Sequence, residues 1–206
     1  NDFGYSVSLS NDGNTIAISN PEDISGINSG YIKIFDWNGT IWVQRGNKIF
    51  GEGAGDKSGW SISLSNDGNT VAIGAYDNDG NGSNSGHVRI YNWSGFSWTQ
   101  VGQDIDGEAA GDRSGYSVSL SSDGNTVAIG ATYNDGNGFQ SGHARIYVWN
   151  GNIWQQRGLD IDGLHIDELS GWSVSLSSDG NTVAIGAIFH DTPVSSEAGS
   201  VKILEW

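Results

Sequence analysis

The sequence predicts an all-β fold, a β-propeller of four blades, from three observations. One phrase, Gly4-Tyr-Ser-Val-Ser-Leu-Ser10, returns from Gly59, Gly115 and Gly171, so that the glycines lie 55, 56 and 56 residues apart. Each of the first three copies contains four segments of strand-forming residues separated by turn residues, and the fourth copy contains three. No segment repeats its apolar residues every 3.6 positions, so we expect no helix. Four antiparallel strands in each unit of about 56 residues is the pattern of a propeller blade.

The second repeat shows the expected strands most clearly. The first covers 61–65 and the second 70–75, joined by the tight-turn sequence Asn66-Asp-Gly-Asn69. The third covers 87–91 and the fourth 98–102, with Ser94-Gly95 at the turn between them. The same order recurs in repeats bounded approximately at 1–55, 56–111, 112–167 and 168–206, which we treat as one repeat domain. A β-solenoid is disfavoured, because its rungs are usually shorter and carry parallel strands.

The fourth repeat ends at Trp206, before its fourth strand, so one blade lacks a strand. Three arrangements fit this pattern. The chain closes into a ring of four blades with one thin blade, or it is four blades of a larger ring. In the third arrangement the missing strand comes from another molecule, because an open edge invites strand pairing. No signal peptide is visible and residue 1 lies inside a structural unit, so we expect a piece of a longer protein.

Composition excludes several classes of function. The chain has 206 residues with 9 basic and 24 acidic side chains, a net charge of -15. We therefore expect no nucleic-acid partner and no binding to anionic membranes. The absence of Cys excludes disulfides, thiolate zinc sites and a cysteine nucleophile. No run of 18 apolar residues is present, so we expect no membrane insertion.

The repeated phrases resemble FG-GAP repeats, which form the propellers of integrin α-subunits and related proteins. Phe3-Gly4-Tyr-Ser-Val-Ser8 matches the first phrase of that repeat, and Ala72-Ile-Gly-Ala75 and its copies from Ala128 and Ala184 match the second without its proline. The resemblance implies an extracellular propeller used in adhesion or ligand recognition. Many relatives carry a calcium loop, Asp-x-Asp-x-Asp-Gly, between the phrases. Here that place holds Ser65-Asn-Asp-Gly-Asn-Thr70, whose single carboxylate does not match, so that site is not carried over.

Acidic residues gather in the loops that follow the second and fourth strands, which lie on one side of an up-and-down blade. The exceptions are the four Asp residues of the short turns, Asp36 and Glu205. This long-loop face is therefore expected to be electronegative. One interpretation is a solvated surface that keeps the chain soluble. The other is a surface that binds a cation or a basic partner, since loops on a rigid scaffold often carry function.

Two groups of residues are candidate Ca²⁺ ligands. Asp77-Asn-Asp79-Gly-Asn81-Gly82 has the alternating oxygen donors and the glycine that open a calcium loop, without its closing Glu. The next repeat keeps Asp135 and Asn137 of this set. The second group is Asp104, Asp106 and Glu108, partly repeated in the third repeat. Ca²⁺ is the only cofactor that the sequence indicates.

Histidine and tryptophan supply the other candidates. His87 and His143 occupy equivalent positions, which favours a structural role. His165, with Asp167 and Glu168 beside it, has the residue types for acid–base chemistry or metal binding, although a simple variation of the repeat explains it equally. Three Trp pairs flank the turns before the fourth strands, where they either pack along the blade edge or stack on sugar rings; the pairs are Trp37 and Trp42, Trp93 and Trp98, and Trp149 and Trp154.

Together these features predict a non-catalytic recognition or adhesion domain, extracellular or at the cell surface. It would bind a glycan or protein ligand through the acidic long-loop face. The alternative is a structural subunit of an extracellular fibre or array that self-associates through its incomplete blade. An enzyme with an active site at the propeller axis is the weakest hypothesis, because no catalytic constellation is recognisable in the sequence.

Overall fold

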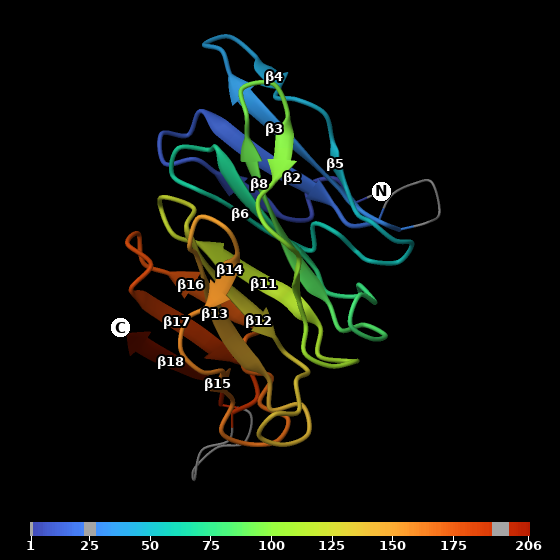
Figure 1. Cartoon of the computed structure of the whole chain (residues 1–206), viewed down its shortest axis with the longest axis vertical. Coiled ribbons are helices and arrows are strands. Elements are labelled where there is room, and N and C mark those ends of the chain that lie inside the picture. Colours follow the sequence, from blue (N-terminus) through green and yellow to red (C-terminus); the bar gives the residue numbers. More distant parts are fainter. Residues whose placement is uncertain (1, 23–27, 191–197) are drawn as a thin grey trace.

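The computed structural model describes residues 2–22, 28–190 and 198–206, and in these residues all regular structure is β. The strands fall into four antiparallel sheets, blades 1 to 4, that follow one another along the chain (Figure 1). Blade 1 contains β1 (Val7–Leu9), β2 (Thr15–Asn20), β3 (Tyr31–Trp37), β4 (Trp42–Gln44) and β5 (Ile49–Phe50); blade 2 contains β6 (Ser61–Leu64), β7 (Thr70–Ala75), β8 (His87–Trp93), β9 (Trp98–Gln100) and β10 (Ile105–Asp106). Blade 3 contains β11 (Ser114–Leu120), β12 (Thr126–Ala131), β13 (His143–Trp149), β14 (Trp154–Gln156) and β15 (Ile161–Asp162); blade 4 contains β16 (Ser173–Leu176), β17 (Thr182–Ala187) and β18 (Ser200–Glu205).

The outer strand of each complete blade consists of two pieces, where the sequence predicted a single strand, over 98–102 in blade 2, followed by a loop. In blade 2, β9 pairs with the end of β8, through Trp93 and Trp98, and β10 pairs with its beginning, through His87 and Asp106. Gly102, between the two pieces, has a φ of 74° and lies against the next blade, where a Cβ would strike the ring of Trp149. The two pieces together form the fourth strand, so the four-stranded blade is confirmed with a break in its outer edge.

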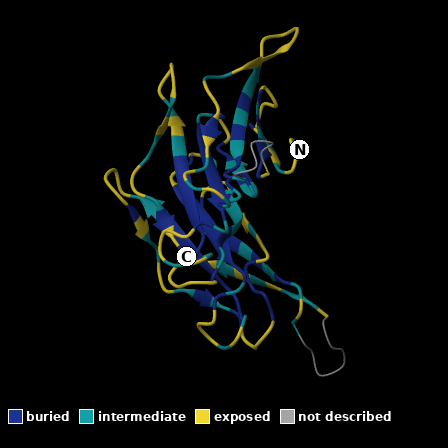
Figure 2. Ribbon diagram, turned by 90° about the vertical axis from the view of Figure 1, so that its right-hand side faces the viewer, coloured by how far each residue is buried: buried dark blue, intermediate teal, exposed yellow. Residues whose placement is uncertain are grey.

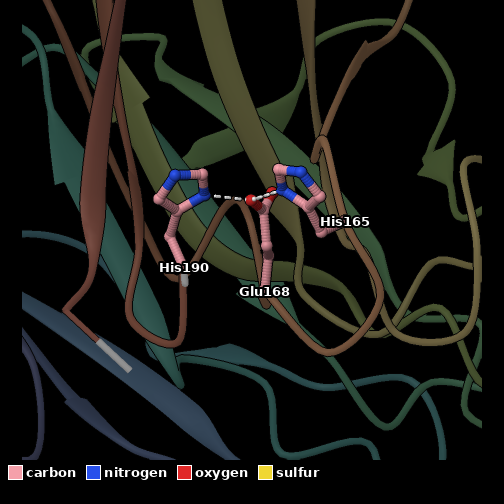
Figure 3. A group of neighbouring side chains, drawn as sticks. All are labelled: His165, Glu168 and His190. Atoms are coloured by element: carbon pink, nitrogen blue, oxygen red, sulfur yellow. Dashed lines mark hydrogen bonds and ion pairs between the residues drawn. The ribbon is translucent and has the colours of Figure 1, made fainter. Parts of the chain in front are cut away.

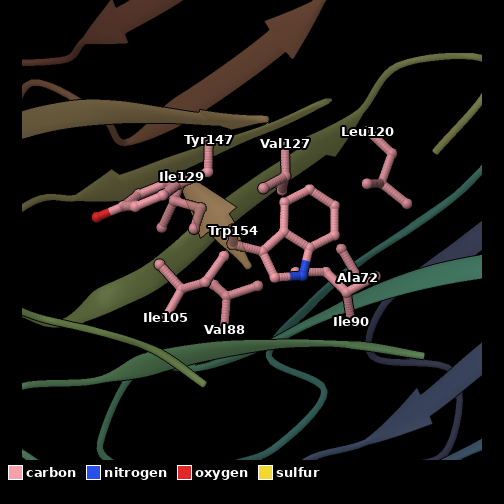
Figure 4. Packing of buried hydrophobic residues seen from close by; sticks show 9 residues of the cluster. All are labelled: Ala72, Val88, Ile90, Ile105, Leu120, Val127, Ile129, Tyr147 and Trp154. Carbon is pink, nitrogen blue, oxygen red and sulfur yellow. The ribbon is translucent and has the colours of Figure 1, made fainter. Parts of the chain in front are cut away.

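The core lies between blades. Each blade has a forward face, toward the next blade, and a rear face, toward the previous one. In blade 2 the forward face presents Ala72, Val88, Ile90 and Ile105, and these pack against the rear face of blade 3 (Figure 4). That rear face presents Leu120, Val127, Ile129, Tyr147 and Trp154. Equivalent residues fill the other two interfaces, so one packing arrangement is repeated along the chain.

The four blades form an open row, with blade 1 at one end and blade 4 at the other (Figure 1). On the rear face of blade 1, Val7 is 59% exposed and Leu9 56% exposed. On the forward face of blade 4, Val201 is 67% exposed and Ile203 69% exposed. Since the same positions are buried at the internal interfaces, blades 1 and 4 do not pack on each other. The row therefore does not close into a four-bladed ring.

Burial follows this plan. The middle blades are the most deeply buried, and exposure increases toward the turns and the two ends of the row (Figure 2). All six residues of β7 and of β12 are buried, whereas β17 alternates between buried and half-buried positions. The strands β7 and β12 need small residues where blades approach closely. A Cβ on Gly74 of β7 would collide with the backbone carbonyl oxygen of Gly115 in the next blade. Among the described residues no helix has the length and apolar character needed to cross a membrane.

Candidate functional site

The first predicted calcium group is held in place by interactions within and between loops. Asp79 Oδ1 accepts a hydrogen bond of 2.8 Å from the backbone amide of Asn84. Asn81 Nδ2 donates to the carbonyl oxygens of Gly107 and Glu108, each at 2.9 Å. Asp77 lies 3.9 Å from Arg113 Nε. Burial raises the pKa of Asp77, while the hydroxyl of Tyr76 and the charge of Arg113 act in the opposite direction. Each side chain thus has its own partner, and Ca²⁺ binding here stays a prediction.

The third repeat confirms that these partners belong to the repeat. Asp135 Oδ1 accepts a hydrogen bond of 2.7 Å from the backbone amide of Gln140. Asn137 Nδ2 donates to the carbonyl oxygen of Gly163 at 2.8 Å. Two loops with different sequences therefore use the same Asp and Asn to brace the same fold. Asp23, Asp191 and Glu197, which the sequence places on this face, lie outside the described residues.

The second predicted calcium group is divided between two clusters. Asp104 lies with Glu52 and His87, whereas Glu108 lies with His143 and Asp160, and the ligand atoms within each cluster are within 4.8 Å of one another. Asp106 belongs to neither; its backbone carbonyl accepts a hydrogen bond of 2.7 Å from Arg145. Burial, followed by the charge of Asp104, raises the pKa of Asp106. The sequence could not indicate this division, because it arises between neighbouring blades.

The repeated histidines are buried, as a structural role requires. His87 is 2% and His143 1% exposed. Burial, reinforced by the neighbouring Arg89 and Arg145, lowers the pKa of each imidazole to about 4. Both are therefore neutral at pH 7. Since Arg145 Nη1 is also 3.6 Å from Glu108 Oε1, a cation already occupies the vicinity of the cluster around His143.

The predicted tryptophan pairs form the outer contacts between blades. The rings of Trp93 and Trp98 are 5.4 Å apart, and Trp98 Nε1 donates a hydrogen bond of 2.9 Å to the carbonyl oxygen of Arg45 in blade 1. Trp154, paired with Trp149 at 5.5 Å, is buried and donates in the same way to Val101. In blade 1, on whose rear face no other blade packs within the described residues, Trp37 and Trp42 are 39% and 43% exposed. Packing occupies the indoles of blades 2 and 3, and sugar stacking on the pairs stays a prediction.

A second set of aromatic residues, not identified from the sequence as a site, crosses the long-loop face. It consists of the residue that follows the repeated glycine in each blade, namely Tyr5, Trp60, Tyr116 and Trp172. Successive ring centroids are 4.6, 5.7 and 4.8 Å apart. Tyr76 joins this aromatic row, 4.5 Å from Trp60. The repeated Gly-Tyr/Trp phrase was visible in the sequence, but only the stacking of blades places its aromatic rings side by side.

Arg113 and Asp77 lie beside the aromatic row. The guanidinium of Arg113 is 5.5 Å from the ring of Tyr76 and 4.4 Å from the ring of Tyr133. Burial, followed by the charge of Asp77 and its hydrogen bond, raises the pKa of Tyr76 to about 12. Tyr5 and Trp172, at the two ends of the row, are 46% and 36% exposed. The row therefore combines exposed aromatic faces with fixed polar groups.

A buried carboxylate joins the loop before each of blades 2 to 4 to the loop that follows the second strand of that blade. In blade 2, Asp56 Oδ2 accepts hydrogen bonds from Asn78 Nδ2 at 3.0 Å and from the amide of Gly53 at 2.7 Å. In blade 3, Asp112 Oδ2 accepts from Asn134 Nδ2 at 3.1 Å and from the amide of Ala109 at 2.9 Å. We call this arrangement the Asp–Asn latch. In blade 4, Glu168 and His190 take the latch positions and His165 takes the position of Ala109.

Four antiparallel sheets packed face to face, with long loops on one side, define the class: the chain forms blades of a β-propeller. The FG-GAP repeat family model matches residues 51–91 and 104–147. The two matched segments lie in the second and third repeats, whose phrases are similar to those of that family. A search of curated protein sequences gives no match.

Solved structures support the fold at low sequence identity. Hydrazine synthase from Kuenenia stuttgartiensis superposes with a TM-score of 0.58 and 16% identity, over 97% of this chain and 50% of that chain. A putative 6-phosphogluconolactonase from Bacteroides uniformis gives a TM-score of 0.61 and 11% identity, over 98% of this chain and 57% of that chain. A putative 6-phosphogluconolactonase from Bacteroides fragilis gives a TM-score of 0.52 and 15% identity, over 76% of this chain and 38% of that chain. The chain thus spans about half of the length of the first two proteins and less than half of the third. The similarity concerns the fold alone.

Proposed function

We propose that the chain is a non-catalytic, extracellular recognition domain that binds a glycan through the aromatic row and the carboxylates beside it. The observation that carries this proposal is the continuity of the row across all four blades. Aromatic faces supply broad apolar contact for the C–H groups of a sugar ring, and nearby carboxylates accept hydrogen bonds from its hydroxyls. An extended row suits an extended chain of sugars, because several modest contacts made together add to the overall affinity.

Glycan-array binding followed by calorimetry tests this proposal. The variant Tyr5→Ala/Trp172→Ala removes the two ends of the row, where the side chains are 46% and 36% exposed. We expect it to lose at least about tenfold in affinity for any glycan that the native chain binds, which corresponds to about 1.4 kcal/mol. Phe96→Ala is the control, since Phe96 is 92% exposed and lies outside the row, in the turn between β8 and β9. Absence of any glycan ligand, or a larger loss in the control, would refute the proposal.

A second function, a subunit that assembles with copies of itself, is favoured by the exposed ends of the row of blades. The rear face of blade 1 has an apolar hollow of about 260 Å³ lined by Phe3, Ile16, Ile18, Phe35 and Trp42. The equivalent surfaces of blades 2 and 3 receive the forward face of the previous blade. The forward face of blade 4, on which no other blade packs within the described residues, would enter this hollow in a second copy. The outer edge of β18 also lacks a paired strand within the described part of the chain.

Sedimentation of two complementary variants tests assembly. Val201→Asp/Ile203→Asp blocks the forward face of blade 4, and Val7→Asp/Leu9→Asp blocks the rear face of blade 1. Each variant alone should remain monomeric at concentrations where the native chain associates. A mixture should form a one-to-one complex, because one intact forward face and one intact rear face remain. A monomeric native chain, or a mixture that does not associate, argues against front-to-back assembly.

A further inference from the structure

The latch of blade 4 differs chemically from the latches of blades 2 and 3. In blades 2 and 3 the buried carboxylate accepts one hydrogen bond from an amide side chain, of Asn78 or Asn134. In blade 4 the carboxylate of Glu168 lies between two imidazoles (Figure 3). His165 Nδ1 is 2.9 Å from Glu168 Oε1, and His190 Nδ1 contacts the same oxygen. A single oxygen is thus shared by two ring nitrogens that come from different loops.

This geometry places three ligand atoms of suitable chemistry around one point. One ring nitrogen of each histidine and a carboxylate oxygen lie within 4.8 Å of one another. Two imidazole nitrogens with one carboxylate oxygen form a donor set that zinc accepts in proteins, with a further position for water. The clusters around His87 and His143 each contain one imidazole and two carboxylates, and an arginine ion pair reaches each of them.

Burial and access are also suited to a metal ion. The side chain of Glu168 is only 3% exposed, and the backbone amide of Leu164 holds its second oxygen, Oε2, at 2.5 Å. Such a hydrogen bond to a ligand fixes its orientation, as partners of metal ligands commonly do. The side chain of His165 is 60% exposed, so the cluster opens to solvent. A hydrated ion therefore has a route to the carboxylate.

We propose that His165, Glu168 and His190 form a binding site for a divalent transition-metal ion of the zinc type, at the junction of blades 3 and 4. In this site both histidines bind through unprotonated Nδ1, and Glu168 supplies one oxygen. The metal joins the two loops that the Asp–Asn latch joins in the other blades. The site is independent of the glycan proposal and of the predicted calcium groups.

The test is zinc uptake by the purified chain, measured by elemental analysis after dialysis against Zn²⁺ and buffer. We expect one ion per chain, and Co²⁺ in its place should give the visible absorption of a low-coordinate nitrogen–oxygen site. The matched variant is His165→Ala/Glu168→Asp/His190→Asn, which rebuilds the latch of Ala109, Asp112 and Asn134. It should keep the fold and lose more than about 100-fold in zinc affinity. Replacing a residue that only orients a metal ligand already costs up to about 100-fold, and this variant removes the ligands themselves.

Two further variants keep the test decisive. His165→Ala alone alters an exposed side chain and should weaken zinc binding without unfolding the chain, even if the triple variant folds poorly. Asp160→Asn changes the cluster around His143 and should leave zinc uptake unchanged. The proposal is overturned if the native chain takes up no zinc, if the latch variant binds it as tightly, or if Asp160→Asn abolishes binding.

Discussion

Ile90 and Ile203 occupy equivalent positions on the forward faces of blades 2 and 4, and their truncation to alanine tests whether stability resides between blades. Ile90 is 0% exposed and packs against the rear face of blade 3. Ile203 is 69% exposed. The chemistry of the two substitutions is identical, so any difference in their effect reports the presence of the neighbouring blade.

The expected magnitudes differ widely. Ile90→Ala removes buried methyl groups and leaves a cavity, which costs about 2–5 kcal/mol of the free energy of unfolding. Ile203→Ala removes a largely solvated side chain and should change that free energy by about 0.5 kcal/mol or less. For a chain of this size, 1 kcal/mol corresponds to roughly 2–4 °C in Tm. Ile90→Ala should therefore lower Tm by at least about 4 °C, and Ile203→Ala by little.

Thermal and urea unfolding, followed by circular dichroism at low micromolar concentration, measure both effects on monomeric protein. Repeating the melts at high concentration separates folding from assembly, because an associated copy would bury Ile203 and make its truncation costly. The reasoning is refuted if Ile203→Ala destabilises the dilute monomer as much as Ile90→Ala does. A neutral Ile90→Ala would refute it equally, since the interface would then contribute nothing.

Three further predictions concern glycine packing and acid stability. Gly74→Ala should destabilise the chain strongly, because the new Cβ meets a backbone carbonyl, whereas Gly186→Ala at the equivalent position of blade 4 meets only the hydroxyl of a serine and should be milder in urea unfolding. Hydrogen bonds within the turn, first from Ser10, lower the pKa of Asp12 to about 2, so its contribution to stability is complete above about pH 4 and is lost as pH falls toward 2; Asp12→Asn should flatten this part of the pH–stability curve. Burial lowers the pKa of His87 to about 4, so NMR should show its ring titrating there, and stability should fall as pH drops from 6.5 toward 4.

The strands were predictable because their causes are local. Alternating side chains and turn residues determine where a strand such as β7 begins and ends, and the repeat quadruples the signal. The break in the outer strand was not predictable in this way. It depends on Gly102 and on the ring of Trp149, which belongs to the next blade and lies 47 residues away in the sequence.

The candidate sites were less predictable than the fold, because each depends on contacts between blades. Asp104 and Glu108 are four residues apart, yet they belong to different clusters. Trp98 and Trp154 are predicted candidates for sugar stacking, and the sequence did not indicate that their indoles donate hydrogen bonds to the preceding blade. A sequence reports which residues repeat; it does not report which surface of a blade the neighbouring blade covers.

Comparison of equivalent positions also shows which residues of one blade replace an interaction that the other blades share. Blade 1 has Tyr31 where blades 2 and 3 have histidine, and Lys48 where they have an acidic residue. The Lys48 ammonium lies 4.2 Å from the Tyr31 ring, so a cation–aromatic contact takes the place of the histidine cluster. The two substitutions in blade 1 therefore explain each other, and they leave no side chain without a role.

The substitutions in the latch of blade 4 differ, because its two histidines do more than replace the asparagine side chain of the other latches. Asn78 and Asn134 each donate one side-chain hydrogen bond to a buried carboxylate, which also accepts one from a backbone amide. His190 alone would provide that hydrogen bond, so bracing the loop does not explain why His165 reaches the same oxygen. A shared cation explains both imidazoles at once, because it links two nitrogen lone pairs to a carboxylate whose counterparts in blades 2 and 3 each have a single side-chain donor. The surplus imidazole is therefore the feature that separates a metal site from a variant latch, and His165→Ala is the substitution on which the two accounts differ most.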